Sequence, residues 1–349
     1  MGLNRDFWRG RRVLLTGHTG FKGAWLARWL HRLGAEVHGF ALPPEGEPNL
    51  SRLLATPLAG ETLADLRDAP AVERALRVAA PDVVLHLAAQ ALVPASYRDP
   101  LGTWTSNVIG TINLLEAMRR YDRPLAALIV TTDKVYANDE RGLAFPETAP
   151  LGGDDPYSAS KAATEIAVHS WRKSFLGQRV ALATARAGNV IGGGDWSAER
   201  LIPDIVRAAQ RGEAVLLRRP EATRPWQHVL DPLYGYLLYA EALFVRRELP
   251  GGLNFGPLED EKISVGTIAT QLTQAFDAPA WRTEPQPAIA EKGQLGLDAR
   301  LAVQSLGWRP HFSTAAALAE TVNWYKDWLA GENPAAMTDR QIAAFEDRL

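Results

Sequence analysis

The strongest constraint on the fold of this chain is a glycine motif, Thr16-Gly17-His18-Thr19-Gly20-Phe21-Lys22-Gly23, directly after the apolar run 13–15. An amphipathic stretch to residue 33 follows, so a strand, a glycine turn and a helix come in that order. Gly17 permits a tight turn, Gly20 lets the backbone approach a ligand, and Gly23 lets the helix pack against its strand. Since free N–H groups at a helix start bind anions, the motif predicts a pyrophosphate site.

Apolar runs alternate with helical periodicity through the first half of the chain. The predicted strands are 12–15, 36–41, 82–88, 126–131 and 180–185, and the predicted helices lie near 21–33, 70–79, 105–121 and 158–175. Continuous apolar strands such as 83–87 fit a parallel sheet that is covered on both faces. We therefore predict an α/β fold, a Rossmann-type doubly wound parallel sheet with a smaller C-terminal lobe that binds substrate.

The second half of the chain reads differently. Beyond about residue 187 the alternation becomes irregular and rich in glycine and proline, although 231–244 is helix-like and is expected to return to the sheet. We expect a cofactor-binding domain over 1–186 with a returning segment at about 225–250. A second lobe is expected over 187–224 and 251–349, ending in a helical tail from 335.

Charge and composition limit the partners. The net charge of -2 and the pI near 6.4 offer no general attraction for nucleic acid or anionic lipid. The absence of cysteine excludes disulfides, thiolate metal sites and a cysteine nucleophile, and we expect no metal. No apolar stretch has the length of a membrane span, and residues 1–10 lack a signal-peptide core. We expect a cytoplasmic protein that binds a small molecule and neither membrane nor nucleic acid.

Polar and small residues follow several predicted strands at their carboxyl ends, where doubly wound sheets bind ligands. Tyr157 and Lys161, four residues apart, would lie on one face of a helix. An ammonium group beside a phenol lowers its pKa, normally about 10, and lets Tyr157 exchange a proton with a hydroxyl near neutral pH. Tyr-x-x-x-Lys also arises by chance, but its place after the glycine motif and between sheet strands favours a catalytic role.

Together these motifs resemble those of the extended short-chain dehydrogenase/reductases, T-G-x-x-G-x-x-G and Y-x-x-x-K, over nearly the whole chain. Longer blocks resemble nucleotide-sugar 4,6-dehydratases that act on CDP-D-glucose, namely 16–23, 133–134, 186–196, 200–204 and 224–229. The resemblance implies oxidation at C4 of the sugar, loss of water and reduction at C6, with tightly bound NAD. The product would be CDP-4-keto-6-deoxy-D-glucose, a precursor of deoxysugars in bacterial polysaccharides.

Catalytic roles follow from this resemblance. Tyr157 would remove the proton of the 4-hydroxyl, Thr132 would hold that hydroxyl, and Lys161 would also bind the nicotinamide ribose. Asp133 matches the position of the acid that protonates the leaving 6-hydroxyl, and Lys134 that of the base at C5. Related dTDP-glucose dehydratases carry glutamate in place of Lys134, which could act as a base only when neutral. The alternatives are that Lys134 positions an oxygen or a water, and that Asp133 caps a helix or pairs with Lys134.

The expected cofactor contacts are also carried over from the family. The pair Asp65-Leu66 would read adenine, with a loop-capping role for Asp65 as the alternative. Other residues expected at the cofactor are Gly17, His18, Thr19, Gly20, Phe21, Lys22, Gly23, Ala88, Ala89, Asn107, Tyr157 and Lys161. One departure concerns the ribose. An acid normally lies about twenty residues after the glycines, but this chain has Phe40-Ala41-Leu42 there, so the choice of NAD over NADP rests on the resemblance.

Substrate contacts are expected from the second lobe. Arg224 matches a residue on the nucleotide pyrophosphate, where a guanidinium can make paired bonds. The further expected substrate contacts are Gln90, Asn189, Arg200, Leu201, Arg218 and Asn254. Two rival functions remain: an epimerase or reductase of the same family, which needs no acid-base pair at 133 and 134, and a dinucleotide sensor without catalysis. By analogy with the family, a homodimer through the helix that bears Tyr157 is expected.

Overall fold

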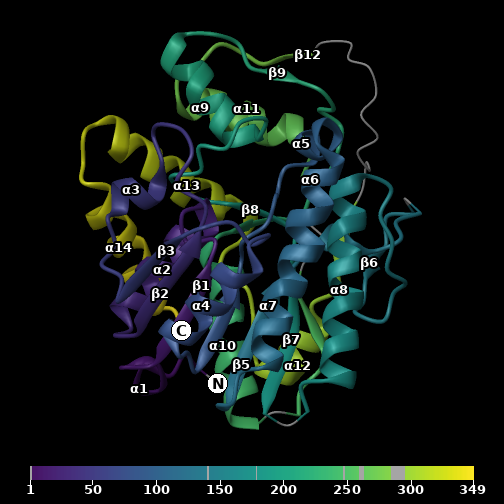
Figure 1. The fold of residues 1–349 in the computed structure, drawn as a ribbon. Coiled ribbons are helices and arrows are strands. Elements are labelled where there is room, and N and C mark those ends of the chain that lie inside the picture. Colours follow the sequence, from purple (N-terminus) through teal and green to yellow (C-terminus); the bar gives the residue numbers. More distant parts are fainter. Residues whose placement is uncertain (1, 140, 178, 247, 259–262, 284–294) are drawn as a thin grey trace.

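The computed structural model describes residues 2–139, 141–177, 179–246, 248–258, 263–283 and 295–349. A parallel sheet lies at its centre with helices on both faces (Figure 1). Within the described residues this sheet has seven strands, in the order β11-β7-β5-β4-β1-β2-β3. The predicted doubly wound α/β fold is therefore confirmed. The strands are β1 (Arg12–Thr16), β2 (Glu36–Ala41), β3 (Gly60–Leu63), β4 (Val83–His86), β5 (Leu125–Val130), β6 (Ala144–Phe145), β7 (Val180–Ala187), β8 (Asn189–Ile191), β9 (Leu216–Leu217), β10 (Trp226–His228), β11 (Gly252–Phe255), β12 (Arg282–Thr283) and β13 (Gly296–Leu297).

The period of two along the strands divides the core into two layers. Val13 and Leu15 of β1 pack into one apolar cluster with α2 and α10, while Leu14 faces the other cluster with α4, α7 and α8. Figure 1 shows these two sets of helices on opposite faces of the sheet. The helices are α1 (Arg5–Trp8), α2 (Phe21–Arg32), α3 (Leu50–Leu54), α4 (Ala69–Ala79), α5 (Val93–Arg98), α6 (Pro100–Trp104), α7 (Gly110–Arg119), α8 (Pro156–Ser174), α9 (Leu201–Arg211), α10 (Leu230–Arg246), α11 (Val265–Ala275), α12 (Arg300–Leu306), α13 (Thr314–Leu329) and α14 (Pro334–Glu346).

The predicted elements and the observed ones differ at several points, and three of these concern the central sheet and the helices beside it. β3 was not predicted, because its side chains are alternately exposed and partly buried and form no apolar run. β11 was also missed, since a short strand is easily hidden in an irregular stretch. The predicted helix over 105–121 is instead α6, a π-helical turn at Thr105–Ile109 and then α7. No helix within the described parts of the chain combines the length and apolar character needed to cross a membrane.

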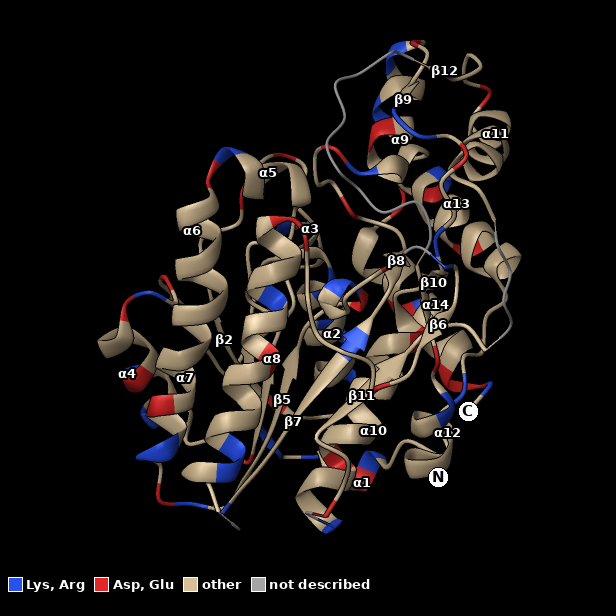
Figure 2. Ribbon diagram, turned by 90° about the vertical axis from the view of Figure 1, so that its right-hand side faces the viewer, with Lys and Arg blue, Asp and Glu red and all other residues tan. Residues whose placement is uncertain are grey.

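The expected boundary at residue 251 is corrected by the sheet itself. β11 pairs in parallel with β7, with Gly252 opposite Thr184 and Phe255 opposite Ala187. The C-terminal helix α14 lies against α2, where the Trp29 indole donates to Glu346 at 2.9 Å. Much of 251–349 therefore packs on the cofactor-binding part. The separate lobe consists instead of α9, β9, α11 and β12, which extend beyond one end of the sheet (Figures 1 and 2).

Helix α13 holds the glycine-rich segment that follows β8. A side chain at Gly193 would lie 2.0 Å from the Trp324 ring of α13, so glycine is required there. The Trp25 indole of α2 donates to the Gly193 carbonyl at 3.0 Å, and the Tyr325 hydroxyl donates to the Asp195 carbonyl at 2.6 Å. Contacts from α2 and α13 thus hold the segment that leads to α9 in place.

Candidate functional site

The glycine loop after β1 has the geometry that the sequence predicts. Gly17 has φ +78°, and a Cβ there would lie 2.7 Å from the Ala88 nitrogen. A Cβ at Gly23 would lie 2.0 Å from the Gly17 carbonyl oxygen, whereas at Gly20 the nearest atom would be that oxygen at 3.5 Å. The loop is therefore closed by backbone at Gly17 and Gly23 and open at Gly20, the N-cap of α2. An open glycine at a helix start fits a dinucleotide pyrophosphate.

Two polar residues next to the loop contact the neighbouring strands. His18 is buried, and its Nε2 lies 2.8 Å from Glu61 Oε1 on β3. Its Nδ1 has no hydrogen-bond partner in the part of the chain that the structure describes. Thr19 donates through its hydroxyl to the Leu42 carbonyl at 3.0 Å. Glu61 thus brings to the glycine loop the carboxylate that the end of β2 lacks. Sequence reasoning missed Glu61 because β3 was not predicted.

Asp65, expected to read adenine, is engaged within its own loop. Its carboxylate accepts from the Arg67 backbone N–H at 2.8 Å and from the Arg67 side chain at 2.6 Å. These bonds lower the pKa of Asp65. The structure therefore favours the loop-capping alternative for Asp65. Leu66 beside it is buried, and a Cβ at Gly110 would lie 2.8 Å from its Cβ.

Residues after β4 form a braced wall beside the loop. Ala88 touches Gly17, and Ala89 follows it. The Asn107 amide donates to the Gln90 carbonyl at 3.0 Å and to the Ser160 hydroxyl at 2.9 Å, while its oxygen accepts from the Gln90 N–H at 2.8 Å. The Gln90 side chain donates to Thr103 at 2.9 Å. Asn107 and Gln90 thus join the wall to α8 and α6, and the expected ligand contacts of both residues stay predictions.

The segment after β5 forms the centre of the site. The Thr132 hydroxyl donates to Asp133 Oδ1 at 3.0 Å, and Asp133–Val135 form a 3₁₀ turn. Asp133 Oδ2 is buried and has no hydrogen-bond partner among the described residues, and a Cβ at Gly188, after β7, would lie 3.2 Å from it. Burial raises the pKa of Asp133, opposed by the charges of Lys134, Arg224 and Lys22. The structure thus gathers an acid from β5, the backbone after β7 and three cations.

Tyr157 and Lys161 lie on α8 as predicted, but the expected coupling between them is not what sets their protonation. Burial raises the pKa of Tyr157 to about 12, against a hydrogen bond with Thr132 that lowers it. Lys161 donates through Nζ to the Val130 carbonyl at 3.1 Å, and burial together with the charge of Lys22 lowers its pKa to about 7. Desolvation dominates the pKa of Tyr157, which therefore lies above its ordinary value and not below it as expected.

Lys22 reaches this same centre from the glycine loop. Its Nζ lies 5.9 Å from the ring centroid of Tyr236, a buried residue of α10. Burial first, and then the charge of Arg200, lower the pKa of Lys22 to about 8, while Asp133 raises it. Phe21 beside it is partly buried, and a Cβ at Gly192 would lie 3.2 Å from its ring. The sequence placed Lys22 in the motif but gave no sign that it approaches Asp133.

The expected substrate residues divide into two groups. Arg224 is buried within electrostatic reach of Asp133 and donates to the Thr223 carbonyl at 2.9 Å. Asn189 is the first residue of β8, and Leu201 is the first residue of α9. Arg200 Nη1 lies 3.1 Å from Asp195 Oδ2. All of these lie in or near the segment after β7.

Arg218 and Asn254 lie in other surroundings. Arg218 is 3.5 Å from Glu199, which also binds Arg98 of α5 at 2.9 Å. Asn254 has 0% exposure, and its amide donates to the Phe145 carbonyl at 2.9 Å and the Asp298 carbonyl at 3.1 Å. Asn254 therefore joins β11 to β6 and to Asp298 after β13, and its expected contact with substrate stays a prediction.

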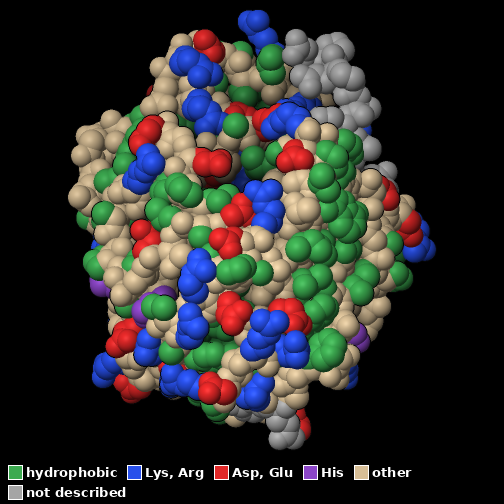
Figure 3. All heavy atoms as spheres, in the orientation of Figure 1, with side chains coloured by type: hydrophobic (Ala, Val, Ile, Leu, Met, Phe, Trp, Pro, Cys, Tyr) green, Lys and Arg blue, Asp and Glu red, His purple; other side chains and the backbone are tan. Residues whose placement is uncertain are grey.

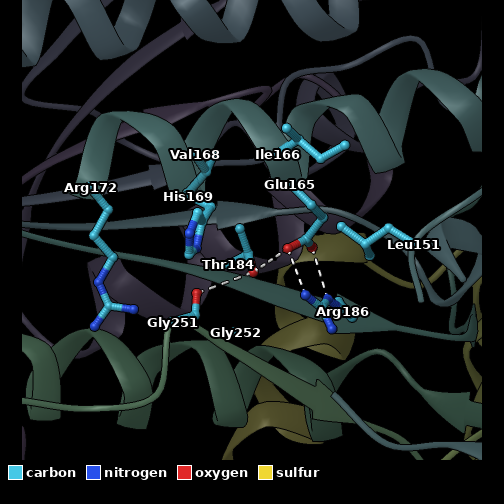
Figure 4. A pocket seen from close by; sticks show the side chains of 10 residues that line it. All are labelled: Leu151, Glu165, Ile166, Val168, His169, Arg172, Thr184, Arg186, Gly251 and Gly252. Atoms are coloured by element: carbon cyan, nitrogen blue, oxygen red, sulfur yellow. Dashed lines mark hydrogen bonds and ion pairs between the residues drawn. The ribbon is translucent and has the colours of Figure 1, made fainter. Parts of the chain in front are cut away.

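A separate cavity of about 340 Å³ lies behind α8, bounded by β7 and the start of β11 (Figure 4). The described residues that line it include none of those expected at the site. Its wall holds the ion pair of Glu165 and Arg186, which sequence reasoning missed. Within the described ranges, no group of His, Cys, Asp or Glu is placed to hold a metal ion.

Comparison with known proteins identifies the relatives of this chain. The model of the NAD dependent epimerase/dehydratase family matches residues 13–247. The chain is 38% identical to CDP-glucose 4,6-dehydratase of Salmonella typhimurium, with 98% of each chain covered. It is 29% identical to dTDP-glucose 4,6-dehydratase 1 of Escherichia coli, over 75% of this chain and 77% of that one. The structure of dTDP-glucose 4,6-dehydratase from Streptomyces venezuelae with NAD has a TM-score of 0.80 at 26% identity and covers 93% of this chain and 99% of that one.

The glycine loop gives a direct test of cofactor binding. Gly20→Ala adds a methyl group that meets protein at an ordinary 3.5 Å, so we expect an unchanged melting temperature but NAD binding weakened about tenfold or more. Gly23→Ala forces a clash at 2.0 Å and should disturb the loop itself. Calorimetric titration with NAD and thermal melts measure both effects. Equal NAD affinity in Gly20→Ala and the parent would contradict the assignment of the glycine loop as the pyrophosphate site.

Proposed function

The chain belongs to the NAD dependent epimerase/dehydratase family, and we propose that it is a 4,6-dehydratase that converts CDP-D-glucose to CDP-4-keto-6-deoxy-D-glucose. The observation that carries this proposal is the full-length similarity to CDP-glucose 4,6-dehydratase, together with a buried acid beside Tyr157. An epimerase has no use for an acid that protonates a leaving hydroxyl. Another nucleotide-sugar dehydratase or an epimerase of the family is the alternative.

The glycine loop and the N-terminus of α2 would hold the cofactor of this family, NAD. When bound, NAD supplies a hydride acceptor, a hydride donor and a positive charge at the site. We assign Tyr157 as the group that takes the proton of the sugar 4-hydroxyl and later returns it. Thr132, hydrogen-bonded to the phenol, would hold the same hydroxyl. Because the pKa of the phenol is raised to about 12, chiefly by burial, positive charge near the phenol is required for this transfer near neutral pH.

Elimination of water needs an acid at the 6-hydroxyl and a base at C5. Asp133 fits the acid, because burial raises its pKa and favours the protonated carboxyl that can donate. We assign Lys134, the neighbour of Asp133 on the same turn, as the base. Lys22 is the second candidate for the base. Burial and the charge of Arg200 lower its pKa to about 8, which favours the neutral amine that a base must be.

The nucleotide would lie between the sheet and the lobe of α9, β9, α11 and β12. We propose Arg224 as the main contact of the pyrophosphate, with Arg200 and Asn189 as further contacts near it. In this arrangement the domain that binds cofactor comprises the sheet with its flanking helices and the C-terminal tail. Nucleotide sugars and NAD are metabolites of the cytoplasm, so we also place the enzyme there.

A homodimer is proposed through α6, α8 and the turn between α6 and α7. Leu101 and Ile166 are 73% and 60% exposed, and Trp104 and Ile109 are exposed beside them. Figure 3 shows hydrophobic side chains gathered on this side of the molecule. An exposed apolar patch of this kind favours a protein partner, and the family analogy makes that partner a second copy of this chain.

The substrate is tested by mass spectrometry. Purified protein with CDP-glucose should give a product lighter by one water, with no net consumption of NAD, because oxidation and reduction cancel. A panel with dTDP-, GDP- and UDP-glucose serves as the control. Turnover of one of those nucleotide sugars while CDP-glucose stays unchanged would reject cytosine as the nucleobase of the substrate. A product of unchanged mass but inverted configuration at C4 would identify an epimerase.

The acid and base are tested by transient kinetics. We expect Asp133→Asn and Lys134→Met to slow elimination about 10²–10⁴-fold while slowing the first oxidation less, since each removes one proton-transfer group. The reduced cofactor should then accumulate, measured by its near-ultraviolet absorbance. Tyr157→Phe is the control and should slow the first oxidation, so that little reduced cofactor forms. Accumulation in Lys22→Met but not in Lys134→Met would move the base role to Lys22.

The dimer is tested by charge substitution in the patch. Ile166→Glu would bury a carboxylate in an apolar interface, so we expect the dimer to dissociate to monomers, measured by light scattering. Val245→Glu is the matched control, because Val245 is also exposed but lies on α10, away from the patch. A monomeric parent, or a dimeric Ile166→Glu protein, would contradict this interface.

A further inference from the structure

A buried ion pair links the catalytic helix to the central sheet. Glu165 lies on α8, one turn beyond Lys161, and Arg186 lies on β7. Arg186 Nε donates to Glu165 Oε1 at 2.9 Å and Nη2 donates to Oε2 at 2.8 Å (Figure 4). The side chain of Arg186 is 8% exposed, and that of Glu165 is 4% exposed. Burying two charges costs solvation that their attraction often fails to recover, so net stabilisation is a poor explanation for the pair.

The carboxylate of Glu165 also holds the strand that leads into the catalytic turn. The Thr131 hydroxyl donates to Oε1, and the Thr184 hydroxyl donates to Oε2 at 2.7 Å. Thr131 directly precedes Thr132, whose hydroxyl meets both Asp133 and the Tyr157 phenol. Glu165 therefore fixes the start of the catalytic turn relative to α8.

The guanidinium of Arg186 holds the other end of the same turn. Its Nη1 donates to the Tyr136 hydroxyl at 2.7 Å and to the Glu147 carbonyl at 3.3 Å. The Tyr136 hydroxyl in turn donates to Asn254 Oδ1 at 2.7 Å, on β11. Tyr136 directly follows the 3₁₀ turn Asp133–Val135. The segment that carries Thr132, Asp133 and Lys134 is thus held on both sides by one ion pair.

We propose that Glu165 and Arg186 are positioning residues, which fix the catalytic turn at 132–134 in its productive place relative to Tyr157 and Lys161 on α8. Neither contacts the reacting groups in this scheme. The proposal rests on the proposed dehydratase function, because it assigns the two residues to that site. Small displacements of reacting groups lower the reaction rate strongly, since a misplacement of about 1 Å can slow a reaction about a hundredfold.

The charge of Glu165 has a second effect on the same helix. It raises the pKa of Lys161, against burial and the charge of Lys22, which lower it. Loss of the carboxylate should therefore lower the pKa of Lys161 further. From the other elements, Lys22 on α2 adds its charge at Lys161. His86 on β4 also faces Lys161, but burial lowers the pKa of His86 to about 3, so its ring is neutral at physiological pH.

The test compares Glu165→Gln and Arg186→Lys with the parent. Lysine keeps the charge of Arg186 but lacks the planar fork that bonds two partners at once. We expect kcat to fall about 10- to 100-fold while KM stays within about threefold, because nucleotide binding does not use the pair. In Glu165→Gln, the kinetic pKa that reports Lys161 should move down. Arg172→Lys is the matched control, on the same helix and the same cavity wall, where Arg172 bonds the Leu249 carbonyl at 2.7 Å.

A double variant separates positioning from stability. Replacing both partners, in Glu165→Met/Arg186→Met, removes the unpaired charge and should restore much of the stability that single variants lose. If the pair positions the turn, kcat stays low in this stable protein. Recovery of kcat together with stability would overturn the proposal, and so would a fall in stability alone with parental kcat.

Hydrogen exchange provides a measurement that needs no substrate. Amides of 131–136 should exchange about tenfold faster in the single and double variants, because the turn has lost its restraints. The amides of α10 should keep the parental rate. Unchanged exchange at 131–136 contradicts the positioning role whatever the enzyme acts on. If the parent leaves CDP-glucose unchanged, kcat ratios are taken on the nucleotide sugar it does turn over, so the two proposals fail separately.

Discussion

Desolvation of titratable side chains at the carboxyl ends of β5 and β7 governs what this site can do. Burial raises the pKa values of Tyr157 and Asp133 and lowers those of Lys161 and Lys22. Each of these shifts favours the uncharged form of its group. For the carboxylic acid and the two amines, these shifts bring the pKa values closer to neutral pH, where such groups can exchange protons. For the phenol, the shift moves the pKa away from neutral pH, so proton transfer at Tyr157 needs positive charge nearby.

The fold supplies this dry environment through backbone contacts. Gly17 and Gly23 bring α2 against the ends of β1 and β4, and Gly188 brings the end of β7 against Asp133. Side chains at these glycines would separate the elements and admit water. The helices packed on both faces of the sheet exclude solvent from its core. The ion pair of Glu165 and Arg186 then holds the turn at 132–134, for which the glycines leave space. Close packing and proton chemistry therefore depend on the same few positions.

Local features were predictable from the sequence, and long-range ones were not. The glycine loop, the central strands and the spacing of Tyr157 and Lys161 follow from residue types at short separations, so they were predicted. Glu61, Asn254 and the pair of Glu165 and Arg186 depend on which strands lie side by side, which short edge strands do not reveal. The pKa of Tyr157 moved opposite to the expectation, because a sequence shows a neighbouring charge but not the degree of burial.

Ligand charge is what couples these neutral groups to catalysis. Lys22, Lys134 and Arg224 all act on Asp133, and Arg200 acts on Lys22, so the site has more cationic than anionic groups. A nucleotide diphosphate relieves this repulsion and favours protonated amines, whereas a cationic ring beside them favours neutral amines and an ionised phenol. The two ligands therefore pull the same groups in opposite directions. Of the two, only the positive charge favours loss of the phenol proton, which ties the first chemical step to the bound cofactor.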